Sequence, residues 1–445
     1  MKKFLLLLPM LAISGIIIGQ NPFIRDQFTA DPTARVFNGK VYVFPSHDIM
    51  SPIEPERAWF CMEDYHVFSS ENLVDWTDHG VIVTQNKAPW VREDSYAMWA
   101  PDAIEKDGKY YFYFPAPAKP EYGRGSMIGV AIADKPEGPY IPIEKPITGA
   151  NGIDPCVLID KDGQAYLYWC GGGMWVAKLK PNMIELDGER QQVQGLPPGG
   201  GLKEGPFVFE RNGIYYYTYP WVKNNTTELL YYCTGDNPMG PFRDGGVIMD
   251  EWPSKCWTNH HSFVQFKGQW YLFYHHNDYS PDFDKNRSAR IDSVTFNTDG
   301  TIQKVIPTLR GVGLTDARKE IQIDRYTSIS DSSATVIFLN PRNPFEGWKT
   351  ILSREDGWVR YNNIDFTTGG FSKAKSRVYS ARGGTLVIRD GTSITAPVIA
   401  KLEVPASGRW SVMNVGLSES LSGVKDIFVS IEGNNPVQVD WISFE

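Results

Sequence analysis

Short runs of apolar and aromatic residues recur in pairs between residue 21 and about residue 314, and a tight turn signal separates the members of each pair. Asn-Gly or Asp-Gly between two such runs is the strongest short-range signal for a β-hairpin. The pattern predicts five hairpins. Their turn glycines, spaced 50 to 69 residues apart, are Gly39, Gly108, Gly163, Gly213 and Gly268.

A period near 50 residues is typical of a propeller or a solenoid. Each predicted hairpin is followed by more strand-like sequence, such as MIGVAIA at 127–133 and ELLYYCT at 228–234. A repeat therefore holds about four strands, which is the content of one propeller blade. The fold class predicted from this pattern is all-β, with a five-bladed β-propeller built around a central channel.

Polar residues stand just ahead of the first strand in each repeat. If that strand lines the channel, these residues meet at the channel mouth. The repeat then brings several carboxyl groups and an imidazole onto one axis. The predicted mouth residues are Asp31, Asp102, Asp154, Glu204 and His260.

The pattern changes beyond the propeller. From about Lys319 onward, short strands alternate with turn residues, as expected for an antiparallel β-sandwich of the jelly-roll kind. The predicted domains are a leader at 1–20, a propeller at 21–318 and a sandwich at 319–445. Two long stretches, 51–98 and 182–203, interrupt the propeller pattern. The second is rich in Gly and Pro and is either a loop that shapes the pocket or a surface crossover.

Composition narrows the classes of partner. The net charge is −8 and no basic run occurs, which argues against nucleic acid and anionic membranes. Aromatic residues make up 13% of the chain, an excess that suits stacking on sugars as well as packing between blades. The five cysteines show no CxxC spacing, which argues against zinc. Their odd number leaves at least one thiol unpaired, and we expect most of them to be buried and free, with a bridge between Cys156 and Cys170 as the alternative.

The N-terminus reads as a secretory signal peptide. Lys2 and Lys3 precede an apolar run at 4–18, and small or polar residues follow at Gly19 and Gln20. No later stretch is long enough to span a bilayer. We therefore expect a secreted or periplasmic protein with no membrane span after cleavage. An uncleaved N-terminal anchor is the alternative.

Asp31, Asp154 and Glu204 occupy equivalent places in three repeats. Two carboxyl groups, one ionised and one protonated, are the machinery of glycoside hydrolysis, and inversion requires them roughly 6.5–9.5 Å apart. Positions on different blades suit that spacing. Asp31 and Asp154 each precede a proline, so we expect extended backbone at both. An isolated Asp-Pro is commonly a turn former, and only the shared position favours catalysis.

Two other mouth residues are less specific. Asp102 follows a proline, which favours a turn role. His260 is either a ligand for a metal or an anion, or a hydrogen-bonding group in the channel, and the residues alone leave both open.

The repeat motifs resemble the family 43 glycoside hydrolases over about residues 25–314. The motifs include ADPTARVF, MWAPDAIEKDG, GIDPCVLIDKDG, KEGPFVFERNG and HHSFVQF. The resemblance implies five-bladed, inverting enzymes acting on arabinose- and xylose-containing polysaccharides. It implies that Asp31 is the general base, that Asp154 orients and tunes the acid, and that Glu204 is the general acid.

The same resemblance extends to further site residues. It assigns His260 to a calcium ion or its water shell in the channel and implies no organic cofactor. Either Arg287 or Arg290 matches an arginine near the sugar. Trp99 resembles a residue at the terminal-sugar subsite, with blade core as the alternative.

The C-terminal sandwich resembles a family 6 carbohydrate-binding module, on the likeness of GWVRYNNIDF and VDWISFE. Within that family, aromatics and an Asn contact sugar. Candidates here, each with a core or turn role as the alternative, are Trp358, Tyr361, Trp410 and Asn434.

Together these observations predict an inverting exo-glycosidase that removes α-L-arabinofuranosyl groups from arabinoxylan or a related polymer. A β-xylosidase acting on xylo-oligosaccharides is the alternative, because the same three carboxylates would serve both reactions. A non-catalytic sugar-binding propeller is a further alternative. The expected partner is a plant cell-wall polysaccharide or oligosaccharide, and a monomer is the default.

Overall fold

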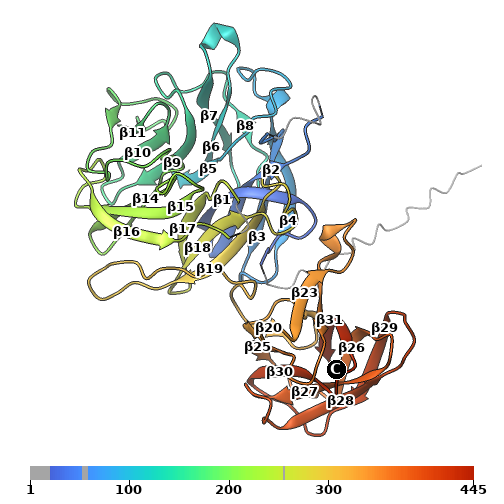
Figure 1. The fold of residues 1–445 in the computed structure, drawn as a ribbon. Helices are drawn as coiled ribbons and strands as arrows, with labels where there is room; N and C mark the ends of the chain where they lie inside the picture. The colour runs from blue at the N-terminus through green and yellow to red at the C-terminus, as the bar shows by residue number, and fades with distance from the viewer. Residues whose placement is uncertain (1–20, 53–58, 254–255) are drawn as a thin grey trace, which may run out of the picture.

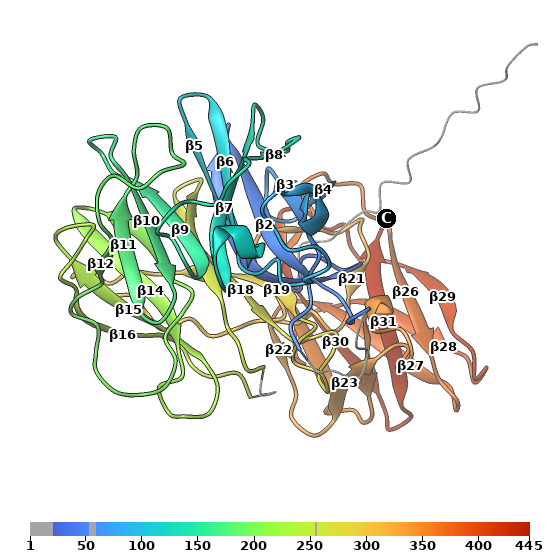
Figure 2. The same cartoon turned by 90° about the horizontal axis from the view of Figure 1, so that it is seen from above.

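The computed structural model describes residues 21–52, 59–253 and 256–445. The signal peptide predicted at 1–20 lies outside the described residues. Within them the chain forms a propeller and a smaller sandwich that lies beside it in both views (Figures 1 and 2). Regular helix in this part of the chain is limited to three short 3₁₀ turns: η1 (Gln85–Lys87), η2 (Pro120–Tyr122) and η3 (Pro344–Glu346).

Five antiparallel sheets formed by the described residues make up the propeller, which confirms the all-β prediction. The first blade holds β1 (Phe28–Phe37), β2 (Lys40–Asp48), β3 (Asp64–Ser70) and β4 (Thr77–Thr84). The second holds β5 (Asp102–Lys106), β6 (Lys109–Pro117), β7 (Ser126–Ala133) and β8 (Ile141–Pro142).

The remaining blades follow the same order from the channel outward. The third holds β9 (Ile153–Ile159), β10 (Ala165–Cys170), β11 (Met174–Lys178) and β12 (Gln191–Gln192). The fourth holds β13 (Phe207–Arg211), β14 (Ile214–Trp221), β15 (Leu229–Gly235) and β16 (Arg243–Met249). The fifth holds β17 (His261–Phe266), β18 (Gln269–His276) and β19 (Ser288–Val294).

The ring closes between the first and fifth blades. Each innermost strand contacts the next one around the channel, and β17 contacts β1. The segment just before β1 runs along β19: Phe23 N–H donates to the Ala289 carbonyl (3.2 Å) and Thr29 N–H to the Arg287 carbonyl (2.9 Å). The N-terminal segment thus covers the open edge of the three-stranded blade, which protects an otherwise unpaired strand.

The five predicted hairpins are present. Four of them turn through two residues that both have positive φ, such as Asn38 (51°) and Gly39 (77°), as type I′ turns require. The third hairpin differs, because residues 160–164 form a longer loop in which Gly163 has positive φ (83°). The Asp162-Gly163 pair correctly predicts a hairpin here, but the loop is longer than the two residues that such a pair usually indicates.

The two long stretches are not interruptions of the repeat. Residues 51–98 contain β3 and β4, the outer strands of the first blade, and residues 182–203 contain the short outer strand β12. β4 and the two-residue β12 are largely exposed, so their hydrophobic signal is weak. β3 is mostly buried, but its sequence DYHVFSS mixes polar and apolar residues without a clear alternation.

Aromatic side chains fill the space between blades. Phe209 stacks on Tyr216 (4.8 Å between ring centroids) and on Phe263 of the next blade (4.9 Å). Such inter-blade packing accounts for much of the aromatic excess, because these rings belong to the buried core. All five cysteines are unpaired and buried, as expected. No helix among the described residues has the length and apolar character needed to cross a membrane.

The C-terminal domain is a sandwich of two sheets around one core. One sheet holds β20 (Thr315–Asp316), β22 (Ser328–Ile329), β25 (Trp358–Asp365), β27 (Gly384–Asp390), β28 (Val398–Val404) and β30 (Val424–Glu432). The other holds β21 (Ile321–Gln322), β23 (Ala334–Phe338), β24 (Trp348–Leu352), β26 (Lys373–Tyr379), β29 (Ser411–Gly416) and β31 (Val437–Phe444). β20 already pairs with β25, slightly ahead of the predicted boundary at 318.

An aromatic cluster joins the two domains. Phe345 of the sandwich contacts Phe28 (4.8 Å between ring centroids) and Tyr279 (5.1 Å), and Trp348 stacks on Tyr279 (5.1 Å). Lys319 also forms an ion pair with Asp75 of the first blade. The sandwich therefore packs against the blades that close the ring.

Candidate active site

A cavity of about 190 Å³ opens at the mouth of the channel. It receives side chains from several blades and brings together most of the residues predicted from the sequence. The lining residues are Asp31, Trp59, Phe60, Met62, Trp99, Ala100, Ile153, Asp154, Leu202, Glu204, Glu228, Trp257, Thr258, His260 and Arg287.

A matching irregularity presents Asp31 and Asp154 to this cavity. In each strand the Asp-Pro pair stands opposite a single residue of the neighbouring strand, which is the arrangement of a β-bulge. Asp31 has φ 49° and Asp154 φ 56°, so the expectation of extended backbone at both was wrong. Positive φ is costly for a residue other than Gly, and such backbone persists where the surrounding structure enforces it, often at functional sites.

The Asp31 carboxylate is held by hydrogen bonds from Arg287 and Ser46. Arg287 Nη1 donates to Asp31 Oδ1 (3.0 Å), and Ser46 Oγ donates to Oδ2 (2.8 Å). Burial alone would raise the pKa of this carboxyl group. The charge of Arg287, with smaller contributions from His275, His260 and the Ser46 hydrogen bond, outweighs burial and lowers the pKa below its ordinary value. Asp31 is therefore ionised at neutral pH.

Two residues that sequence reasoning missed support Asp31. His275 Nδ1 accepts the Asp31 backbone N–H (3.0 Å), which leaves the proton of a neutral ring on Nε2, where it faces the Thr258 carbonyl (3.1 Å). Asp48 accepts two hydrogen bonds from the Arg287 guanidinium, each of 2.9 Å. Arg287 is thereby fixed between two carboxylates, in the bidentate manner that favours arginine.

Asp154 lies beside the backbone that carries Glu204. Its Oδ2 accepts the Gly205 N–H (3.0 Å). Potential ligand atoms of Asp154, Cys170 and Glu204 lie within 4.8 Å of one another. Burial, and then the charges of Glu204 and Asp31, raise the pKa of Asp154 well above its ordinary value. The two neighbouring carboxyl groups therefore do not both ionise readily.

The pKa of Glu204 is raised above its ordinary value. Burial is the main cause and the negative charge of Asp31 adds to it, whereas a hydrogen bond with Glu228 and the charge of Arg287 act in the opposite direction without outweighing burial. A second buried carboxyl group, Glu228, faces it from the fourth blade, and its Oε2 accepts the Asn259 N–H (2.9 Å). Burial and the charge of Glu204 raise the pKa of Glu228 well above its ordinary value. Glu228 was missed because it follows no repeat motif.

These environments separate the carboxyl groups by function. Arg287 lowers the pKa of Asp31, whereas burial raises the pKa of Glu204. That separation is how one site holds a general base and a general acid at the same pH. The pocket can therefore activate a water molecule at Asp31 and protonate a leaving oxygen at Glu204.

The structure decides between the two candidate arginines. Arg287 lines the pocket, whereas Arg290 is buried in β19 outside it, where its Nη1 lies 2.7 Å from His276 Nδ1.

Asp102 is not a turn residue. It is fully buried, forms an ion pair with Arg35 (2.5 Å) and accepts the Val157 N–H (2.6 Å), so it ties three blades together.

Trp99 lies in the pocket wall and is partly exposed, and its carbonyl accepts the Tyr65 hydroxyl (2.6 Å). At the rim, Trp59 and Leu202 are 53% and 48% exposed. A rim of exposed apolar side chains around a polar floor suits a sugar ring, which has apolar faces and polar hydroxyl groups at its edges.

His260 lies in the pocket, with its Nδ1 3.7 Å from Asp31 Oδ1, and burial lowers its pKa to about 4. No group of potential metal ligands found among the described residues includes it. Its neighbour His261 has the unsatisfied atom: Nδ1 is buried without a hydrogen-bond partner, while Nε2 lies 2.7 Å from Thr218 Oγ1. A metal role for His260 stays a prediction.

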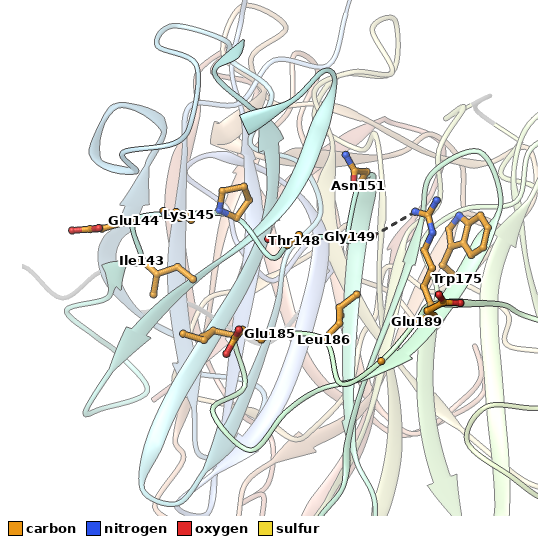
Figure 3. A pocket seen from close by; sticks show the side chains of 14 residues that line it. Ile143, Glu144, Lys145, Thr148, Gly149, Asn151, Trp175, Glu185, Leu186 and Glu189 are labelled. Carbon is orange, nitrogen blue, oxygen red and sulfur yellow. Dashed lines mark hydrogen bonds between the residues drawn. The ribbon is translucent and has the colours of Figure 1, made fainter. Parts of the chain in front are cut away.

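A larger groove of about 890 Å³ lies between the second and third blades (Figure 3). It includes Trp175, over which the Arg190 guanidinium lies 4.1 Å from the ring centroid. Its acidic residues Glu144, Glu185 and Glu189 are exposed. These exposed carboxylates lack the buried, charged surroundings that shift the pKa values of Asp31 and Glu204 in opposite directions. We therefore place the catalytic chemistry in the smaller pocket.

In the sandwich, Tyr361 is a core residue, buried to 1% exposure, with its hydroxyl bonded to the Ile323 carbonyl. Of the two roles considered for Tyr361, the structure therefore supports the core role. Trp358 stacks on Phe428 (5.1 Å between ring centroids) and lines a surface depression of about 490 Å³. Trp410 is partly exposed and packs against Tyr379, and Asn434 is exposed.

Comparison with known proteins gives two family matches. The model described as glycosyl hydrolases family 43 matches residues 19–302, and the model described as carbohydrate binding module (family 6) matches residues 341–445. A xylosidase/arabinosidase 43A of Humicola insolens is 38% identical over 332 residues, covering 63% of this chain and 98% of that protein. An arabinoxylan arabinofuranohydrolase of Bacillus subtilis is 28% identical over 485 residues, covering 95% and 91%.

Solved structures agree with these matches. A family 43 β-xylosidase/α-arabinofuranosidase from a compost metagenome, crystallised with xylotriose in a calcium-free form, has a TM-score of 0.58 and 36% identity, covering 64% of this chain and 97% of its own. The Bacillus subtilis arabinoxylan arabinofuranohydrolase in complex with cellotetraose has a TM-score of 0.57 and 26% identity, covering 97% and 99%.

Proposed function

This chain belongs to glycoside hydrolase family 43, and we propose that it removes terminal α-L-arabinofuranosyl groups from arabinoxylan or a related plant polysaccharide, with inversion. The observation that carries the proposal is the opposite tuning of two carboxyl groups in one small pocket. The pKa of Asp31 is lowered beside Arg287, and the pKa of Glu204 is raised by burial. Inverting glycoside hydrolysis needs that pair.

In the proposed reaction Asp31 accepts a proton from a water molecule, and the water oxygen attacks the anomeric carbon. Glu204 gives its proton to the glycosidic oxygen as that bond breaks. Asp154 holds the Gly205 N–H and keeps its carboxyl group beside Glu204, which positions the acid and opposes its ionisation. Arg287 stabilises ionised Asp31 and lies in the pocket wall, where it can bind a sugar hydroxyl.

Pocket size supports attack at a chain end or side group. A cavity of about 190 Å³ is small beside the roughly 300–1,000 Å³ of pockets that bury drug-sized ligands, so it suits one sugar ring. The family 6 module supplies a second carbohydrate-binding domain. That pairing with the propeller extends over nearly the full length of the Bacillus subtilis relative named arabinoxylan arabinofuranohydrolase.

A second candidate is β-xylosidase activity on xylo-oligosaccharides. Proteins named xylosidase/arabinosidase match about two thirds of this chain at 38% and 37% identity, whereas the arabinofuranohydrolase matches 95% of it at 28%. The same base and acid would serve both substrates. A purely sugar-binding propeller accounts less well for the tuned acid and base.

We also propose three features that the site alone does not establish. A calcium ion in the channel would be held through its water shell by His260, which lies in the pocket, and would place positive charge near the catalytic carboxyl groups. Loss of thermal stability on chelation in the wild type, and a smaller loss in His260→Ala, would test it. The N-terminal 20 residues would direct export as a cleaved signal peptide, which N-terminal sequencing of the exported protein checks. The protein would act as a monomer.

The substrate proposal is tested by incubating purified protein with wheat arabinoxylan and, in parallel, with xylobiose. We expect arabinose from the polymer and little xylose from xylobiose. Xylose release from xylobiose at a comparable rate would move the assignment to β-xylosidase. No sugar from either substrate would contradict the proposal.

Glu204→Gln is expected to lower kcat on natural oligosaccharides by about 10²–10⁴-fold, the usual range for a lost general acid. A substrate with a leaving group that needs no protonation should be affected much less. Glu189→Gln, an exposed glutamate of the larger groove, is the matched control. Equal losses on both kinds of substrate would argue against an acid role.

Ser46→Ala should move the acidic limb of the pH dependence of kcat/KM to higher pH. The lost hydrogen bond stabilises ionised Asp31 by about 1 kcal/mol, so the Asp31 pKa rises by roughly half a unit to one unit. Because the base must be ionised, activity then begins to fall at a higher pH as the solution is acidified. Ser69→Ala, a buried serine bonded to His79, should leave the limb in place. An unmoved limb in Ser46→Ala would count against Asp31 as the base.

A further inference from the structure

A cluster of two histidines and an aspartate lies in the first blade outside the catalytic pocket. His47 is on β2, and Asp64 and His66 are on β3. Ser46 pairs with Tyr65, so His47 lies opposite Asp64, and His66 points to the same face two residues further on. Potential ligand atoms of the three side chains lie within 4.8 Å of one another.

Hydrogen bonds orient both imidazoles. His47 Nδ1 lies 2.8 Å from Asp64 Oδ1, and His66 Nδ1 lies 3.1 Å from both oxygens of Asp78. An ionised carboxylate can only accept, so the His66 Nδ1 carries the proton, and the neutral ring keeps a lone pair on Nε2. Asp78 behind His66 is the usual arrangement around protein metal sites, because it fixes the ring and strengthens the ligand. At His47 the ion would take the place of the proton shared by Nδ1 and Asp64, so His47 would bind through Nδ1 and Asp64 through its carboxylate.

We propose that His47, Asp64 and His66 bind a divalent transition-metal ion of the Zn²⁺ class. Two imidazole nitrogens and one carboxylate oxygen are a zinc donor set, with water completing the coordination. Calcium and magnesium prefer oxygen ligands throughout, so this site differs in chemistry from a calcium site. The side chains of His47, Asp64 and His66 are 22%, 13% and 15% exposed, which leaves an ion a path in from solvent.

The site is close to the base but does not include it. His47 stands between Ser46, which donates to Asp31, and Asp48, which accepts from Arg287. A bound ion would join β2 to β3 beside these two residues and stabilise the folded blade. The inference does not rest on the proposed glycosidase function, because none of its ligands is a catalytic residue.

Isothermal titration of chelator-treated protein with ZnCl₂, in buffer containing excess CaCl₂, tests the proposal. Excess calcium fills any calcium site in advance. We expect one ion per chain, and binding weakened by about tenfold or more in His66→Ala. His79→Ala is the matched control, since His79 lies on the adjoining strand, bonds Ser69 and is not in the cluster. If His66→Ala is unstable, His66→Gln removes the ligand with less loss of packing.

Two results would overturn the proposal. One is zinc binding of equal strength in the wild type and both His66 variants. The other is binding that is lost in Glu204→Gln instead, which would place the ion at the Asp154, Cys170 and Glu204 group of the active site. Anomalous scattering at the zinc edge should show the ion between His47 and His66.

Discussion

Closure of the propeller ring is the constraint on which the active site depends. The segment before β1 is held along β19 by backbone hydrogen bonds, including that of Thr29 N–H with the Arg287 carbonyl (2.9 Å). Asp31 follows two residues later, and the Arg287 side chain reaches back to it (3.0 Å). The base and its cationic partner therefore come from opposite ends of the propeller sequence. They meet only when the first and fifth blades are docked, so catalytic geometry and ring closure are one structural requirement.

Once the ring is closed, the surroundings of each carboxyl group set its pKa and therefore its role. All of them are buried, and burial alone would raise every pKa. Arg287 reverses that effect at Asp31. At Glu204 the more weakly acting charge of Arg287 does not outweigh burial, and Asp154 has no cation among the causes of its shift, so the pKa values of both remain raised. In a poorly hydrated pocket such differences in charge act strongly, which is why one added guanidinium is enough to separate a base from an acid.

The parts of the site that repeat could be read from the sequence, and the parts that do not repeat could not. Asp31, Asp154 and Glu204 were found because the sequence repeat puts each near the start of the inner strand of its blade, although Asp31 and Asp154 lie within β1 and β9. Glu228 and His275 lie on other strands and carry no periodic signal, although they surround the same carboxyl groups. The positive φ at Asp31 and Asp154 was missed because local proline sterics predict extended backbone, and the bulge overrides them. Hairpins followed from turn residues, whereas the weakly patterned outer strands β3, β4 and β12 needed tertiary structure.

The division of Asp31 and Glu204 into base and acid is tested most directly by proton NMR of the sugar released during the first minutes of hydrolysis, before mutarotation mixes the anomers. An ionised Asp31 that activates water opposite a protonated Glu204 gives a single displacement. The first product expected from α-linked arabinofuranosyl groups is therefore β-L-arabinofuranose. Early release of the α-anomer would mean a covalent intermediate on a carboxylate and would contradict the assignment of Asp31 as the base.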